Sequence, residues 1–332
     1  KYFAFGTSVT SVRHGDDSEW IIQTTNGATH TVAAVVVASG HFSQPYVPPI
    51  RGLPLPFPPT IAHSGTYTNN TDYTGQHVLI IGCGASGVEI APEIAAVAQT
   101  VTVVAPKRKP QDEFFEIPQH VRASHPNLAL REDLVHRLCV VDGGEYVAEL
   151  ESGGRVHGIS RILFCTGYLY DYPFLHRECG ISVDEGKRVR PLVEHLWNAE
   201  YPTMCFPALL WKALTFPLIE LQVRVFLRVL KETNGFLGEV GGEWGRDERL
   251  RRARFQNGGR DAKYGHMLGE EHEAYVRRLL SIEYKDDDIP DEWERMLAVY
   301  AEAGPARLVH GADYRKRDYI LKGRDFHVVN KF

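Results

Sequence analysis

Three glycines with the spacing G-x-G-x-x-G form the first pattern in this chain that could bind a ligand. Gly82, Gly84 and Gly87 directly follow the apolar run 77–81, and apolar residues recur at helical spacing from Val88 to Ala98. The first glycine permits a tight turn, the second lets backbone approach a pyrophosphate, and the third lets a helix pack close to a sheet. The order strand, glycines, helix predicts a dinucleotide-binding unit, with a glycine turn that serves packing alone as the alternative.

The first turn of the predicted helix would add to this site. Its N–H groups and the positive end of its dipole would point at phosphate oxygens. We therefore expect the pyrophosphate to contact the loop and the helix start, namely Gly82, Gly84, Ala85, Ser86 and Gly87.

A cluster of cations follows the second predicted strand of this unit, Thr100 to Val104. Lys107 and Arg108 stand there, and the next acidic residue is Asp112. An Asp or Glu about 20 residues past the glycines would accept a hydrogen bond from the ribose 2′-OH of NAD. Cations instead suit a 2′-phosphate, which an arginine can meet with two parallel hydrogen bonds. Lys107 and Arg108 thus favour NADPH over NADH, and a solvated surface loop is the alternative.

Composition excludes several function classes. The chain has 332 residues, of which 43% are hydrophobic, so it can hold two domains with sizeable cores. A net charge of −5 gives no reason to expect nucleic acid or an anionic membrane as a partner. The five scattered cysteines form no C-x-x-C and the histidines show no ligand spacing, so we expect no metal site and a reducing, cytoplasmic compartment. The most apolar stretch, Cys205 to Leu230, carries charges, and we expect no membrane anchor.

Several short strands are expected before the glycines. The dipeptide Asn26-Gly27 predicts a hairpin turn, the apolar run Ala33 to Ala38 predicts a return to a buried sheet, and residues 40–60 form a proline-rich linker. The other expected strands are Tyr2 to Phe5, Val9 to Arg13, Glu19 to Thr24 and Thr29 to Val32.

The residues around this linker carry a resemblance to a known family. Phe57, His63 and Tyr67 fall on the F-x-G-x-x-x-H-x-x-x-Y fingerprint, although Pro59 replaces its glycine. In this respect the chain resembles the flavin-containing monooxygenases. The tyrosine at position 67 is similar to the residue at this fingerprint position in the branch of the family that oxygenates nitrogen and sulfur. Taken alone, a histidine in a linker is more often a structural hydrogen-bonding group than a catalyst.

Two later segments extend the resemblance. "ILFCTGYLYDYPFL" (162–175) is similar to the family's segment that returns to the flavin domain, with Cys165 in an alanine position. "FPLIELQVR" (216–224) is similar to a helix start near the flavin, and Ala208 occupies a family glycine position. The resemblance therefore implies that Thr166, Gly167 and Gln222 lie on the flavin side, and that His63 and Tyr67 lie at the crossing between domains.

The resemblance also implies an architecture. The fold expected is α/β and Rossmann-like, with three ββα/βαβ layers and an NADPH domain inserted in a partial FAD domain. No glycine triad precedes residue 40, so the chain is expected to be a fragment or a diverged product without the first FAD fingerprint. The domains expected are 1–48 (FAD-domain remnant), 49–74 (linker), 75–165 (NADP-binding), 166–232 (return to the FAD domain) and 233–332 (a helical tail covering it).

For the complete enzyme the resemblance implies NADPH- and FAD-dependent monooxygenation. A flavin C4a-hydroperoxide would pass oxygen to a soft nitrogen or sulfur of a small amine or sulfide, with O₂ as co-substrate. No catalytic side chain is expected in this segment, and homo-oligomerisation is left open. The alternative is a catalytically inactive NADP(H)-binding fragment. A two-dinucleotide disulfide reductase is disfavoured because no closely spaced cysteine pair exists.

The last third is the least informative part of the sequence. We expect a loop at Gly235 to Gly245, a solvated helix face at Arg246 to Arg254, and amphipathic helices at His272 to Ile282 and Asp291 to Ala301.

Overall fold

The computed structural model describes residues 3–16, 18–53, 60–107, 117–232, 265–284, 289–310, 317–322 and 325–330. The chain divides into two compact units. The first unit contains Lys1–Gln44 and Leu169–Trp293, and the second contains Pro45–Tyr168 and Glu294–Phe332. The strands β5 (Gln44–Pro45) and β14 (Tyr168–Leu169) mark where the chain passes from one unit to the other.

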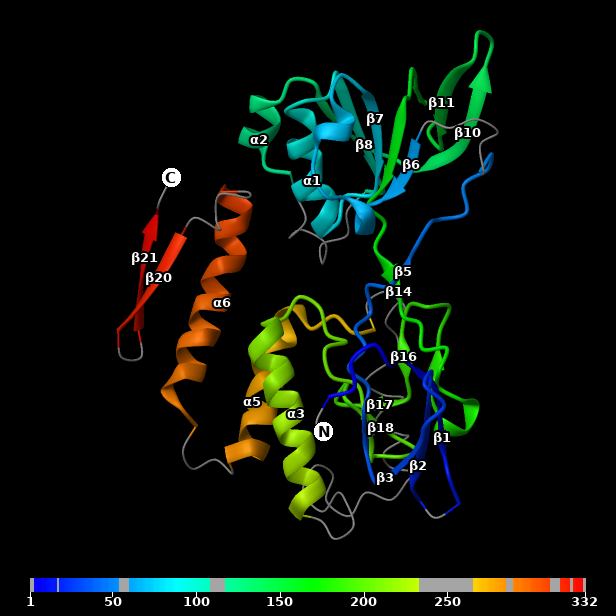
Figure 1. Cartoon of the computed structure of the whole chain (residues 1–332). Helices are drawn as coiled ribbons and strands as arrows, with labels where there is room; N and C mark the ends of the chain where they lie inside the picture. The colour runs from blue at the N-terminus through cyan, green and yellow to red at the C-terminus, as the bar shows by residue number, and fades with distance from the viewer. Residues whose placement is uncertain are drawn as a thin grey trace. The chain divides into compact units, whose positions relative to one another are not determined.

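A five-stranded parallel sheet forms the centre of the second unit, in the order β6-β13-β7-β8-β9 (Figure 1). The chain runs outward from β7 through β8 to β9 on one side, and β13 and β6 lie on the other side. Because the strands are parallel, their carboxyl ends share one edge. The bounds are β6 (Thr60–His63), β7 (His77–Ile81), β8 (Thr100–Ala105), β9 (Leu128–Glu132) and β13 (Arg161–Phe164).

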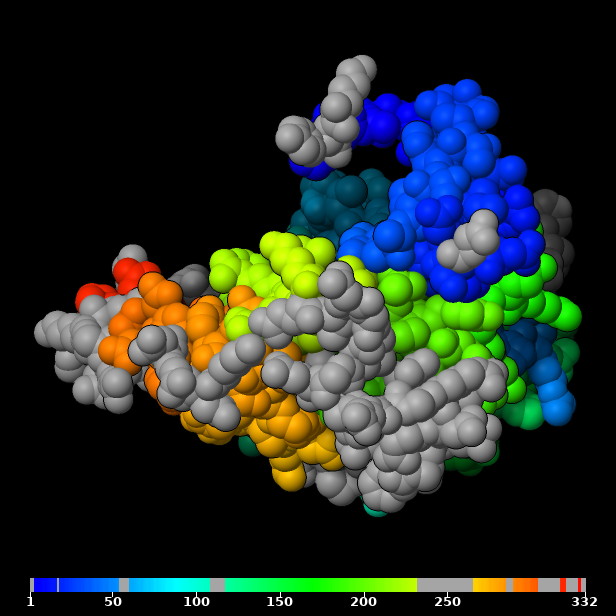
Figure 2. All heavy atoms as spheres, turned by 90° about the horizontal axis from the view of Figure 1, so that it is seen from below, coloured from blue at the N-terminus to red at the C-terminus, as the bar shows by residue number. Residues whose placement is uncertain are grey.

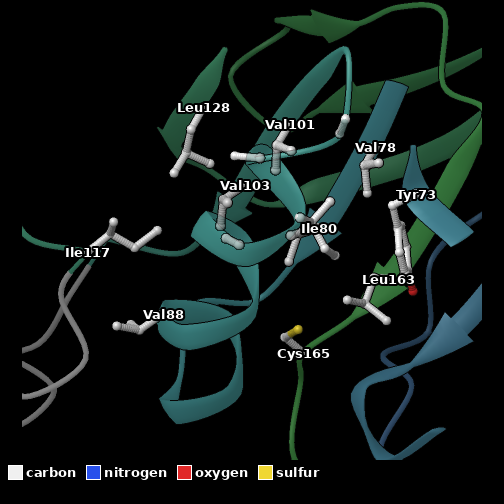
Figure 3. Close-up of a cluster of buried hydrophobic side chains, with 14 residues drawn as sticks. Tyr73, Val78, Ile80, Val88, Val101, Val103, Ile117, Leu128, Leu163 and Cys165 are labelled. Atoms are coloured by element: carbon white, nitrogen blue, oxygen red, sulfur yellow. The ribbon is translucent and has the colours of Figure 1, made fainter. Parts of the chain in front are cut away.

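One face of this sheet packs against helix α1 (Ala85–Ala95). Val78 and Ile80 of β7 and Leu163 of β13 point to this face and meet Ala91 and Ile94 of the helix, all at most 2% exposed (Figure 3). Each buried aliphatic side chain of this size contributes about 1.5–3 kcal/mol by leaving water. The helix begins directly after Gly84, includes Gly87, and is closed at its start by the hydrogen bond from the N–H of Val88 to the carbonyl of Gly84 at 3.0 Å.

The opposite face packs against a three-stranded antiparallel sheet. Leu79, Ile81 and Phe164 point to this face and meet Leu138 and Ala148 of that sheet. Successive residues of β7 and β13 thus alternate between two buried faces, which explains why these strands are continuously apolar in sequence. The antiparallel sheet contains β10 (Val135–Val141), β11 (Glu145–Leu150) and β12 (Arg155–Val156).

The other elements of the second unit are short. Two 3₁₀ turns, η1 (Ser64–Thr66) and η2 (Thr71–Tyr73), lie between β6 and β7, and helix α2 (Gln119–Ser124) precedes β9. Helix α6 (Asp291–His310) begins in the first unit and continues in the second, and the hairpin β20 (Arg317–Lys322) and β21 (Asp325–Asn330) follows it.

The first unit contains two main sheets. One is the antiparallel meander β1-β2-β3, and the other has the order β17-β18-β19-β4, with β4 and β19 parallel. Their bounds are β1 (Val9–His14), β2 (Trp20–Thr24), β3 (Thr29–Val32), β4 (Val35–Val36), β17 (Leu192–Val193), β18 (Trp197–Asn198) and β19 (Met204–Cys205). The hairpin β15 (Ser182–Val183) and β16 (Val189–Arg190) and the turn η4 (Arg177–Cys179) complete the strand region.

Two helices of the first unit pack side by side. They are α3 (Thr215–Glu232) and α5 (His272–Tyr284), and Figure 2 shows their spheres adjacent, yellow-green and orange. Leu221 and Phe226 of α3 and Val276 and Leu279 of α5 are at most 1% exposed. The turn η6 (Gly269–Glu271) leads into α5.

The fold class, the meander with its Asn26-Gly27 turn and the α3 helix are confirmed, but some boundaries predicted from the sequence are wrong. Phe3 to Phe5 form no strand; both rings are exposed (74% and 89%) and stack on each other at 5.8 Å. The first helix of the glycine unit begins at Ala85, not Val88, and continues through Pro92. The stretches 235–245 and 246–254 lie outside the described residues.

Candidate nucleotide-binding site

The predicted site residues of the second unit gather at the carboxyl edge of the parallel sheet. His63, Phe164, Ile81 and Val104 form one row across neighbouring strands. His63 is the last residue of its strand, the glycine loop follows Ile81, Thr166 and Gly167 follow Phe164, and Lys107 follows the end of β8. In open parallel sheets this edge, next to the strand at which the winding direction reverses, is the usual place for a ligand.

Two glycines of the loop are required by packing. Gly82 has φ +98°, a conformation that side chains rarely adopt, and a Cβ on it would lie 2.5 Å from the carbonyl oxygen of Cys165. A Cβ on Gly87 would lie 2.5 Å from the carbonyl oxygen of Gly82. Hydrogen bonds from Gly82 N to Val104 O and from Cys165 N to Ile81 O, both 2.8 Å, fix this arrangement.

Gly84 differs from these two glycines. Its φ is −81° and ψ −160°, which any residue can adopt, and a Cβ built on it would meet nothing within 4 Å. Packing therefore gives no reason for glycine here. Gly84 is the N-cap of α1 and makes no side-chain cap hydrogen bond, and Ala85 beside it is exposed. A backbone that is bare and open at a helix start fits the pyrophosphate of a dinucleotide.

Of the two cations predicted to select NADPH, Lys107 belongs to the described residues and Arg108 does not. Lys107 is exposed and lies two residues past the end of β8, at the same edge as the glycine loop. Arg108 lies outside the described residues, as do Phe57 and Pro59 of the linker fingerprint.

His63 holds two neighbouring segments together. Its Nδ1 accepts from the N–H of Gly65 at 3.1 Å, so Nε2 carries the proton and donates to the carbonyl of Gly167 at 3.0 Å. The ring is 7% exposed, and burial lowers its pKa, against the opposing effect of the Gly167 hydrogen bond. A neutral imidazole with both nitrogens engaged acts as a structural clamp.

Thr166 and Gly167 hold the segment that enters the second unit. The Thr166 hydroxyl donates to the carbonyl of Tyr46, and the N–H of Tyr46 donates to Gly167 O at 2.9 Å. The Gly167 carbonyl thus accepts from both Tyr46 and His63.

Tyr67 packs its ring against Tyr73, with centroids 5.8 Å apart. Its hydroxyl oxygen is buried, and the Glu93 carboxylate lies near it. Burial, and the nearby Glu93 carboxylate to a smaller degree, raises the pKa of Tyr67.

Gln222 belongs to the first unit, so its structural role is separate from the residues above. It is 1% exposed; its Oε1 accepts from the N–H of Ala208 at 3.1 Å and its Nε2 donates to the Tyr275 hydroxyl at 2.9 Å. That hydroxyl donates to Glu194 O at 2.7 Å. Ala208 occupies the position where the resemblance places a glycine. Its φ is +70°, so an alanine here adopts the left-handed backbone conformation that favours glycine.

Sequence reasoning missed the residues that position this edge. Gly65 is one: a Cβ on it would lie 2.6 Å from the Tyr168 hydroxyl, and its N–H supports His63. Tyr46 is another, and it acts through its backbone, for which side-chain type gives no signal. The sequence "HSG" at 63–65 was the one available hint of a tight turn at Gly65.

Comparison with known families decides the classification. Residues 3–197 match the family described as pyridine nucleotide-disulphide oxidoreductase. The chain belongs to this family. Members of the pyridine nucleotide-disulphide oxidoreductase family need not share one reaction, and the five cysteines of this chain include no closely spaced pair.

Within this family, the chain is similar in sequence to flavin-containing monooxygenases. The chain is 31% identical over 232 residues to flavin-containing monooxygenase FMO GS-OX3 of Arabidopsis thaliana, covering 68% of this chain and 47% of that protein. It therefore spans about half the length of the curated relatives it matches. The similarity to flavin-containing monooxygenases inferred from the motifs is confirmed.

Solved structures show the same fold. S-allyl-L-cysteine S-oxygenase of Allium sativum matches with a TM-score of 0.73 and 25% identity, over 93% of this chain and 67% of that chain. The protein Tmm of Pelagibacter sp. strain HTCC7211 matches with a TM-score of 0.71 and 19% identity, over 97% and 68%.

The described residues contain neither a candidate membrane span nor a candidate metal site. None of their helices has both the length and the apolar character needed to cross a membrane. Within the same residues, no group of three or more His, Cys, Asp and Glu side chains is arranged to hold a metal ion.

Proposed function

We propose that the second unit binds NADPH and that the complete protein is an NADPH- and FAD-dependent monooxygenase of soft nitrogen or sulfur atoms in small molecules. Gly84 carries this proposal. Glycine there answers no packing demand, because a side chain would have open space around it. What glycine provides at this position is a bare backbone at a helix N-terminus, which suits a pyrophosphate.

The preference for NADPH over NADH rests on charge. Lys107 follows β8 at the edge of the sheet that carries the glycines, and the chain has no acid between the glycine loop and that point except Glu89 and Glu93 on α1. An acidic side chain after the second strand would bind the 2′-OH of NAD, whereas Lys107 with Arg108 suits a 2′-phosphate.

His63, Thr166 and Gly167 serve this function by holding the edge in shape. Their hydrogen bonds join the crossing segment, the return segment and Tyr46. No side chain among them is arranged to take or give a proton to a substrate. This fits an enzyme in which the cofactor supplies the reactivity and the protein binds, orients and excludes water.

The residues present do not by themselves explain how FAD binds. Gln222 has both ends of its amide engaged within the first unit. We therefore assign no residue of the first unit to the flavin. In the complete enzyme a bound flavin would accept hydride from NADPH and activate O₂.

Soft sulfur or nitrogen as the target is supported by similarity. One structural match at 25% identity is named an S-oxygenase of S-allyl-L-cysteine. A thioether is a soft nucleophile, as is a tertiary amine. The second candidate function is a catalytically silent NADP(H)-binding protein, which the engagement of both ends of the Gln222 amide within the first unit favours.

The test uses the purified chain. Calorimetric titration with NADP⁺ and with NAD⁺ measures the first part of the proposal, and we expect NADP⁺ to bind more tightly. The flavin absorbance band and NADPH oxidation stimulated by a thioether or tertiary amine measure the second part. A colourless protein that binds NADP⁺ supports the silent candidate, and failure to bind either nucleotide overturns the proposal.

A further inference from the structure

Two cysteines lie on neighbouring strand ends at the nucleotide edge. Cys83 stands between Gly82 and Gly84, and Cys165 is the first residue after β13. Phe164 of β13 pairs with Ile81 of β7, so Cys165 lies one residue and Cys83 two residues beyond this pair. Continuing this register places Cys165 opposite Gly82, next to Cys83, and Cys83 is one of the groups that raise the pKa of Cys165, so the two side chains lie close together.

Both side chains belong to the same packed region. Cys165 is 4% exposed in the core cluster under α1 (Figure 3). Cys83 is half-buried and packs against the same cluster. Cys165 also lies directly behind the glycines: a Cβ on Gly82 would be 2.5 Å from its carbonyl oxygen, and one on Gly87 would be 3.4 Å from its Cβ. None of the five cysteines is in a disulfide.

We propose that hydrogen peroxide converts Cys83 and Cys165 to a reversible disulfide that closes the nucleotide site. This inference rests on the proposed function, because it concerns regulation of the same loop. It assigns a modification site to two residues that the nucleotide-binding motif itself does not require. Peroxide is also the product expected when a monooxygenase reduces O₂ without oxygenating a substrate, so the site would respond to unproductive turnover.

The disulfide forms in two steps. The half-exposed Cys83 sulfur attacks one peroxide oxygen; the O–O bond breaks, water leaves, and Cys83 becomes a sulfenic acid. The Cys165 sulfur then attacks the Cys83 sulfur, the S–O bond breaks, and a second water leaves. Two thiols are oxidised by two electrons and one peroxide is reduced to two waters. Burial, with a smaller effect of Cys83, raises the pKa of Cys165 to about 12, and its side chain is 4% exposed, so peroxide reacts first with Cys83. Cys165 loses its proton as it attacks the Cys83 sulfur, and the leaving hydroxide takes up that proton as water.

The disulfide would act through backbone position. Gly82 and Gly84 flank Cys83, and α1 begins at the next residue, Ala85. A covalent bond that draws Cys83 toward Cys165 displaces the segment whose N–H groups would face the pyrophosphate. We therefore expect NADP⁺ affinity to fall and to return when the bond is reduced.

The experiment treats the full chain with hydrogen peroxide, blocks remaining thiols with N-ethylmaleimide, and maps peptides by mass spectrometry. NADP⁺ affinity is measured before oxidation, after it, and after dithiothreitol. We expect a cross-linked Cys83–Cys165 peptide and a loss of affinity of at least about tenfold that dithiothreitol reverses. Cys165→Ala should bind NADP⁺ when reduced but form no cross-link. Cys139→Ser, a half-buried cysteine elsewhere in the same unit, should respond like the unmodified chain.

Two results would overturn this inference. One is a peptide map without the Cys83–Cys165 cross-link after oxidation. The other is a cross-linked protein that binds NADP⁺ as tightly as the reduced protein. If the reduced chain binds no NADP⁺ at all, the proposed function fails, and the peptide map still scores disulfide formation separately.

Discussion

Ala208 is a single residue whose backbone conflicts with its side chain. Its φ of +70° costs an alanine about 1–2 kcal/mol relative to glycine. We predict that Ala208→Gly stabilises the chain by about 1 kcal/mol, visible as a higher urea midpoint, because the N–H that donates to Gln222 is retained. Ala199→Gly, at a fully buried alanine without positive φ, should destabilise. A lower midpoint for Ala208→Gly would show that the turn is not strained.

His266 is a buried imidazole that makes stability depend on pH. It is 1% exposed, its Nε2 accepts from Val189 N at 3.0 Å, and its Nδ1 has no hydrogen-bond partner in the described part of the chain. Burial first, then His195, Arg188 and His41, lower its pKa from 6.5 to about 3. Because the folded pKa lies below the unfolded one, its contribution is fully present above pH 6.5 and is lost as pH falls toward 3.

The corresponding measurement is the free energy of unfolding by urea between pH 7 and pH 5. Each proton taken up on unfolding gives a slope of up to about 1.4 kcal/mol per pH unit. His266→Gln, whose amide oxygen can still accept from Val189, should flatten the slope, while His30→Gln at an exposed position should not. Equal slopes in all three proteins would remove His266 as the cause.

At this scale sequence reasoning succeeds where the chemistry is local. Gly82, Gly84 and Gly87 follow one strand and span the start of one helix, so their pattern is visible in six residues. Gly167, which accepts from His63, and Tyr275, which accepts from Gln222, lie 104 and 53 positions away along the chain, and no local pattern predicts such contacts.

Among the secondary-structure elements, one polar link joins α3 to α5. Gln222 of α3 and Tyr275 of α5 are both buried, and their hydrogen bond continues to Glu194 O. We predict that Gln222→Leu destabilises the first unit by about 1–3 kcal/mol, because it leaves the Ala208 N–H without its acceptor and removes the donor to Tyr275. Glu220→Gln, on the same helix but exposed, serves as the control in the urea titration. An unchanged midpoint for Gln222→Leu would contradict the importance of this link.

Long apolar or amphipathic elements were predictable from the sequence, and their exact ends were not. The β7 strand is a continuous apolar run, and α3 has the periodicity of an amphipathic helix. From the sequence, α1 could begin either within the glycine motif or at the first apolar residue, Val88. The hydrogen bond from the N–H of Val88 to the carbonyl of Gly84 shows that it begins within the motif. Phe3 and Phe5 suit a strand by residue type, but they have no neighbouring strand to pair with among the described residues.

The chain consists of two compact units, of which the second contains the glycine loop and the first contains the β1-β2-β3 meander. If NADP⁺ binds the second unit alone, it should slow backbone hydrogen exchange there, in the residues of β7 and α1, more than in the β1-β2-β3 meander. At 100 times its dissociation constant the ligand adds about 2.7 kcal/mol to the stability of what it binds. Hydrogen exchange followed by mass spectrometry locates this protection, with NAD⁺ as the control. Equal protection of both units would contradict a site confined to the second.

At the scale of the whole molecule, the pairing of strands that lie far apart in the sequence could not be predicted from local patterns. Strand β13 (Arg161–Phe164) pairs with strands that precede it by about 80 to 100 positions, as the His77–Ser160 hydrogen bond across 83 residues illustrates. The resemblance to a family supplied this long-range arrangement, whereas composition and periodicity did not.

The central claim is that the open backbone at Gly84 receives a diphosphate. The most direct test is NADP⁺ affinity of Gly84→Val, because φ −81° and the open space around a Cβ let valine fold there without strain. Gly154→Ala, at another glycine of the same unit without positive φ, is the control. We predict an unchanged urea midpoint for Gly84→Val and an affinity lower by at least about tenfold, with both quantities unchanged in the control. An unchanged affinity in a folded Gly84→Val protein would contradict the account.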